Sequence, residues 1–92
     1  MKAILTYTTM KDGESVERTK LFDTEKAEKI CGVKNSFGNE TKEIYITKSE
    51  IVFIHDIYGK RLEIPDQKEI RKRIGEHEPD KFIKFFGEVE EG

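Results

Sequence analysis

The chain has 92 residues, 35% of them hydrophobic and 39% charged, so we expect one domain, residues 1–92, with a small core and a heavily charged surface. Seventeen basic and 19 acidic residues give a formal net charge of -2, which argues against a surface built mainly for phosphate binding or for DNA mimicry. One cysteine, Cys31, excludes an internal disulfide. With neither a signal peptide nor an apolar run of about 18 residues, we expect a soluble, cytoplasmic protein without membrane contact.

The N-terminal region predicts a β-hairpin. Residues 3–8 favour a strand, and residues 15–22 alternate along a second one. Between them Asp12-Gly13 is a strong turn signal, because both residues tolerate positive φ. The middle of this hairpin is polar enough to form an edge or a partly solvated ribbon.

Residues 23–31 predict a short helix. Asp23 is a suitable N-cap, and Ala27, Ile30 and Cys31 follow the helical spacing i, i+3, i+4. Gly32 would end the helix in the left-handed conformation. A helix of about two turns must be held by packing rather than by propensity.

Residues 40–64 are the centre of the predicted fold, a meander of three short antiparallel strands. β-branched and aromatic residues dominate each segment, and polar residues separate them. The second strand, residues 51–56, is apolar on both faces, which predicts a central strand covered on both sides or in a dimer contact.

Two helices are predicted at the C-terminal end. Pro65 ends the meander and Asp66 caps a helix that carries Ile70 and Ile74 on one face. A last short helix is expected over residues 81–86, followed by an acidic tail, 87–92, that should fray. The prediction is therefore an α+β fold: an N-terminal β-hairpin, a short helix, a three-stranded antiparallel meander, and one or two C-terminal helices packed on one sheet face.

No constellation of catalytic residues is evident. His55 and Asp56 are neighbours in a strand and point to opposite faces, so His55 is expected to be a structural histidine. Cys31 lies near the C-terminal end of its predicted helix, where the helix dipole disfavours a thiolate. His55, His77 and Cys31 are too few and too scattered for a zinc site, and no glycine-rich phosphate loop exists. We therefore expect a protein that is not an enzyme, with no metal and no cofactor.

The small core cannot hold all the aromatic side chains of this chain, and those left outside it are candidates for contact with a partner protein. A Phe in a loop, as Phe37 is, either folds back onto the core, which is the commoner outcome, or stands exposed as a contact residue. Aromatic residues outside a core are typical of protein contacts. The predicted partner-binding residues are Phe37, Tyr45, Tyr58 and Phe85. As an alternative, a small nucleic-acid-binding or regulatory domain would use the basic residues Lys60, Arg61, Arg71, Lys72 and Arg73.

Residues 21–30, Leu-Phe-Asp-Thr-Glu-Lys-Ala-Glu-Lys-Ile, and residues 40–55 resemble a group of small bacterial and phage-borne proteins. In that group a Tyr/Phe-Asp-Thr-x-x-Ala segment precedes a hairpin with Tyr-x-Thr-Lys and two large apolar residues, and then a helix. Tyr45, Thr47 and Lys48 stand at matching positions, whereas Ser49-Glu50 replaces the usual glycine turn.

Some accessory proteins of this type act as anti-CRISPR or other anti-defence inhibitors. The resemblance thus implies a phage or mobile-element protein that binds a host protein, with a CRISPR-Cas effector as the leading target, and inhibits it sterically. A homodimer is a further expectation.

Overall fold

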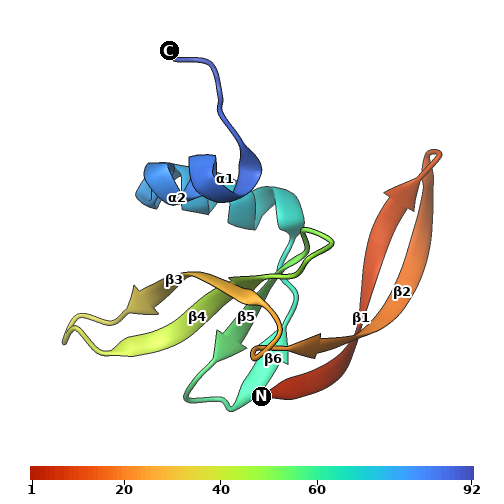
Figure 1. Cartoon of the computed structure of the whole chain (residues 1–92). Helices are drawn as coiled ribbons and strands as arrows, with labels where there is room; N and C mark the ends of the chain where they lie inside the picture. The colour runs from red at the N-terminus through yellow and green to blue at the C-terminus, as the bar shows by residue number, and fades with distance from the viewer.

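The computed structural model describes residues 1–92 and contains a two-stranded sheet, a four-stranded sheet and two helices (Figure 1). The elements in chain order are β1 (Lys2–Lys11), β2 (Glu14–Asp23), β3 (Glu28–Lys34), β4 (Glu40–Ile46), β5 (Val52–Asp56), β6 (Arg61–Glu63), α1 (Gln67–His77) and α2 (Pro79–Phe86). The larger sheet has the order β3-β4-β5-β6, all antiparallel. The predicted α+β class is confirmed, as is the position of the C-terminal helices on one sheet face.

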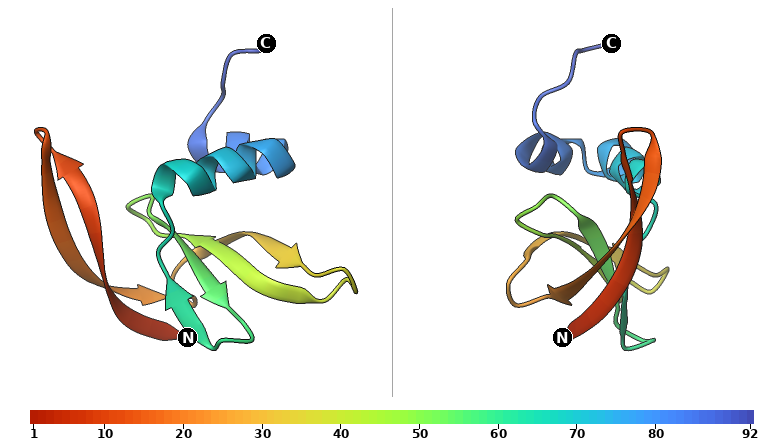
Figure 2. Two further views of the ribbon diagram at one scale, coloured as in Figure 1. Left: turned by 180° about the vertical axis from the view of Figure 1, so that it is seen from behind. Right: turned by 90° about the vertical axis from the view of Figure 1, so that its right-hand side faces the viewer.

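The N-terminal hairpin forms as the sequence predicts. Asp12 and Gly13 have φ of 52° and 80°, so the two-residue turn joins strands that pair in full register from Lys11–Glu14 to Lys2–Asp23. The base of the hairpin lies against the larger sheet, and its outer half stands away from the rest of the molecule (Figures 1 and 2).

The prediction of a short helix over residues 23–31 is wrong, because this segment forms a turn followed by the start of β3. The backbone C=O of Asp23 accepts from the N–H groups of Lys26 and Ala27 at 3.1 and 3.2 Å, which makes one turn, and the chain then enters β3. A β-bulge between Lys29 and Cys31 turns both Ile30 and Cys31 into the core. An isolated helix of about two turns has little stability of its own, so pairing with β4 prevails. The meander therefore has four strands rather than three.

The three strands predicted within residues 40–64 are β4, β5 and β6, and β5 is covered on both faces. Val52 and Phe53 are each 0% exposed, although their side chains point to opposite sides of the sheet. Val52 belongs to a helix-side cluster that includes Ile44, Ile70 and Ile74. Phe53 belongs to a hairpin-side cluster with Phe22 and Leu62, against which the base of β1 packs.

The first helix is fixed to the sheet at its N-terminal end. Asp66 accepts from the N–H of Glu69 at 3.0 Å, as its predicted capping role requires. The amide of Gln67 then accepts from the N–H of Val52 and donates to its C=O, both at 2.8 Å, so that a side chain continues the strand pairing where β6 has ended. Helix α2 packs beside α1, and residues 87–92 form neither helix nor strand (Figure 1). Neither helix combines the length and the apolar composition needed to cross a lipid bilayer.

Candidate functional site

Two of the predicted contact residues lie at the same end of the larger sheet. Phe37 is in the β3–β4 turn and Tyr58 in the β5–β6 turn, and these turns share one end because successive antiparallel strands reverse direction (Figure 1). Phe37 is 87% exposed and Tyr58 is 66% exposed. We call this surface, defined by residues 35–39 and 57–60, the turn end.

Both turns are held by side chains of their own. The Asn35 carboxamide oxygen accepts from the N–H groups of Phe37 and Asn39, at 2.9 and 3.0 Å. In the second turn the Asp56 carboxylate accepts from the N–H of Gly59 at 3.0 Å. Phe37 did not fold back onto the core, because Asn35 closes the turn locally and leaves the ring facing solvent. The two rings are thus presented on defined backbones, which reduces the entropy lost when they bind a partner.

The other two predicted contact residues lie elsewhere and take part in packing. Tyr45 stacks on Phe53, with ring centroids 5.5 Å apart and an interplanar angle of 19°. Phe85 packs against the helix-side cluster, and the Lys84 ammonium lies 5.2 Å from its ring centroid. Phe37 and Tyr58 therefore lie in turns at the same end of the larger sheet, whereas Tyr45 and Phe85 do not.

A chain of charged side chains runs across β3, β4 and β5. Lys29 Nζ contacts Glu40 and lies 3.1 Å from Glu43 Oε2, while Glu43 Oε1 lies 2.8 Å from His55 Nδ1. Burial raises the pKa of Glu43, but the hydrogen bonds to His55 and Lys29 outweigh it and leave that pKa below the ordinary value. The hydrogen bonds to Glu40 and then to Glu43 raise the pKa of Lys29.

From the sequence, only Asp56, the neighbour of His55 in the chain, was weighed as its partner. The actual hydrogen-bond partner, Glu43, was not predicted. The two residues are direct partners in the β4–β5 register. Pairing the predicted strands about their turn at residues 47–51 is the signal that would have found them. The thiol of Cys31, whose pKa burial raises, belongs to the helix-side cluster and is not part of this charged chain. Nor do the His, Cys, Asp and Glu side chains form any group of three or more that could hold a metal ion.

The basic residues of the alternative prediction divide between two places. Lys60 lies at the turn end, and Arg61 follows it as the first residue of β6, with its Nε 3.7 Å from Asp56 Oδ2. The other three, Arg71, Lys72 and Arg73, lie on α1. Arg71 donates to the C=O of Glu50 at 2.8 Å and its guanidinium lies 4.7 Å from the Phe86 ring centroid.

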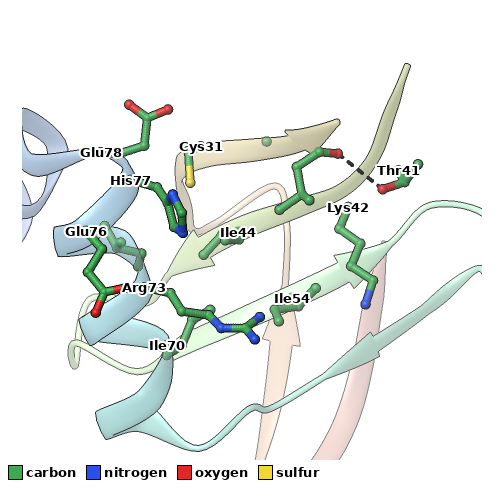
Figure 3. A pocket seen from close by; sticks show the side chains of 13 residues that line it. Cys31, Thr41, Lys42, Ile44, Ile54, Ile70, Arg73, Glu76, His77 and Glu78 are labelled. Carbon is green, nitrogen blue, oxygen red and sulfur yellow. Dashed lines mark hydrogen bonds between the residues drawn. The ribbon is translucent and has the colours of Figure 1, made fainter. Parts of the chain in front are cut away.

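An open groove of about 760 Å³ lies between the C-terminal half of α1 and the helix side of the sheet (Figure 3). Cys31, Ile44 and Ile54 form its sheet wall, and Arg73 and His77 approach from the helix. The sequence could not anticipate the groove, because it depends on where α1 crosses the sheet.

A comparison with known protein families, curated proteins and solved structures finds no match for this chain. The candidate surfaces are therefore judged on their geometry.

Proposed function

We propose that this chain is a non-enzymatic protein of a phage or mobile element that binds a host protein and inhibits it sterically, and we take a CRISPR-Cas effector as the target class. The observation that carries the binding role is the pair of exposed rings, Phe37 and Tyr58, at one end of the sheet. Large aromatic anchors that become buried in a partner supply much of the binding energy of protein interfaces.

The charged chain, in which Glu40 adjoins the β3–β4 turn, suits the rim of such a contact. Lys29 and Glu40 are partly exposed and already paired with each other. Charged groups of this kind contribute orientation and partner choice more than affinity. The target class is supported by the resemblance of residues 21–30 and 40–55 to phage-borne proteins.

The test is phage plating on a bacterial lawn whose CRISPR-Cas system targets the phage. We expect expression of this chain to restore plaques on the targeting lawn and to change nothing on a lawn with a non-targeting spacer. Purified chain should also bind the purified effector, and the complex should survive high salt because apolar contacts dominate it.

The double variant Phe37→Ala/Tyr58→Ala should lose both effects. Its matched control is Ile4→Ala/Leu21→Ala, which removes two apolar side chains that are 71% and 55% exposed on the hairpin. Unchanged inhibition by the turn-end variant would reject the assignment of the contact surface. No plaque recovery and no effector binding by the unaltered chain would reject the target class.

A further inference from the structure

A second cleft separates the outer half of the hairpin from the body of the molecule. It has a volume of about 590 Å³, and one wall is β1 from Thr6 to Met10. The opposite wall consists of Glu50, Ile51, residues 64–68 and Arg71. In Figure 1 β1 is the strand of the hairpin that faces the body, and β2 lies on the far side.

The edge of β1 along this cleft has free backbone hydrogen-bonding groups. The two-residue turn makes Lys11–Glu14 a hydrogen-bonded pair, so the bonded residues of β1 are the odd-numbered ones. The bond from the N–H of Thr24 to the C=O of Met1, 2.9 Å, fits the same alternation. The N–H and C=O groups of Thr6, Thr8 and Met10 therefore point away from β2 and into the cleft, and no other backbone group pairs with them.

Cations outnumber carboxylates when the cleft and the adjoining face of the hairpin are taken together. Lys68 and Arg71 line it, and Arg18 and Lys20 lie on the same hairpin face as Tyr7, which also lines it. None of these four cations forms an ion pair within the chain, although Arg71 donates from its other guanidinium nitrogen to the C=O of Glu50; its buried Nε has no acceptor. Two carboxylates, those of Glu50 and Asp66, also line the cleft; neither forms an ion pair, and that of Asp66 caps α1. Glu14, on the same hairpin face as Arg18, lies opposite Lys11.

We propose that this cleft binds an extended acidic segment of a partner protein, which pairs with β1 as an added strand. The free groups of Thr6, Thr8 and Met10 supply the main-chain pairing that defines strand addition. The unpaired cations select carboxylates, and Ile51 and Ile64 provide apolar contact for alternate side chains of the segment. The inference rests on the proposed role as a binding protein but uses a surface distinct from the turn end.

The probe is a fluorescent peptide of alternating glutamate and valine, about eight residues long, titrated with the full chain and followed by anisotropy. We expect saturable binding that weakens as salt is added. A peptide with lysine in place of glutamate should bind at least about tenfold more weakly, and so should the acidic peptide N-methylated at alternate amides.

Two proline substitutions provide a matched pair. Thr8→Pro removes an N–H that points into the cleft, whereas Glu17→Pro removes one from the cross-strand partner residue, on the outer edge of β2. Both leave the hydrogen bonds of the hairpin itself intact. Thr8→Pro should abolish peptide binding and Glu17→Pro should preserve it.

Equal loss of binding in both variants, or tight binding of the N-methylated peptide, would overturn the strand-pairing geometry. If Thr8→Pro does not fold, the N-methylated peptide still decides the question. Binding that appears only after residues 88–92 are removed would assign the cleft to the chain's own acidic tail and overturn the partner assignment. Because Phe37→Ala/Tyr58→Ala leaves the cleft unaltered, it should bind the peptide normally even if the turn end proves to have no function.

Discussion

The pKa of Glu43 is subject to opposing effects of burial and hydrogen bonding. Burial disfavours its charged form, and the hydrogen bonds to His55 and Lys29 favour that form more strongly, so its pKa is lowered. A carboxylate with a lowered pKa in the folded state adds stability above its unfolded pKa, near 4.5. That stability is lost as the pH falls through the lower pKa of the folded state.

We therefore expect Glu43→Gln to reduce the free energy of unfolding by about 1 kcal/mol at pH 7, since a charge-assisted hydrogen bond is replaced by a neutral one. The difference from the unaltered chain should shrink as the pH falls through the lowered pKa of Glu43 in the folded state, below which Glu43 is protonated in both states. Urea unfolding at several pH values measures it. Glu17→Gln, on the exposed hairpin, is the control and should change stability by less than about 0.5 kcal/mol. A constant difference across the pH range would contradict the assignment.

At the scale of elements, local chemistry predicts the parts whose signals lie within a few residues. The hairpin turn at Asp12-Gly13 and the cap at Asp66 were predicted because turn and cap preferences are set by the residues themselves. The segment 23–31 was not, because the spacing of Ala27, Ile30 and Cys31 also fits a bulged strand. Its pairing with β4, distant in the sequence, decides between the two.

The hairpin is attached to the sheet chiefly through Phe22. This ring is 1% exposed and lies edge-on to Tyr7 and Phe53, with centroid distances of 5.8 and 5.3 Å. Its neighbour Leu21 points to the other face of β2 and is 55% exposed. Because Phe22 and Leu21 are adjacent in the same strand, comparing substitutions at the two positions separates the effect of burial from that of strand propensity.

Phe22→Ala should cost about 3–5 kcal/mol, because it leaves a cavity between the two sheets. Leu21→Ala should cost less than about 0.5 kcal/mol. Thermal or urea unfolding measures both values. Similar costs for the two variants would mean that the hairpin is not held by this contact.

For the whole molecule, the sequence predicted the arrangement of the hairpin, the sheet and the C-terminal helices better than it predicted the side-chain pairs and clefts on their surface. Exposed Phe37 and Tyr58 could be proposed because few core positions remained for them. The Glu43–His55 pair and the cleft along β1 depend on register and on how distant elements are placed, which composition and periodicity do not encode. The same holds for the hydrogen bond from Arg71, a residue of the alternative nucleic-acid-binding prediction, to the C=O of Glu50.

The two clusters should unfold together. Val52 and Phe53, adjacent in β5, support the helix side and the hairpin side respectively, so neither cluster can lose its strand without the other. We expect urea midpoints from far-ultraviolet circular dichroism, which follows the helices, and from near-ultraviolet dichroism of the hairpin-side aromatic rings to coincide. Two separate midpoints would show that the hairpin side melts independently.

The adjacency of Val52 and Phe53 also bears on how this chain can change during evolution. Inserting or deleting one residue in β5 would exchange the sides to which its side chains point and place each of these two beside the wrong layer. Such length changes are tolerated where packing does not depend on which side of a strand each side chain faces. The exposed turns at Asp12-Gly13 and at Ser36 are such places. Related chains should therefore vary in length at those tips while keeping the number of residues in β5 fixed.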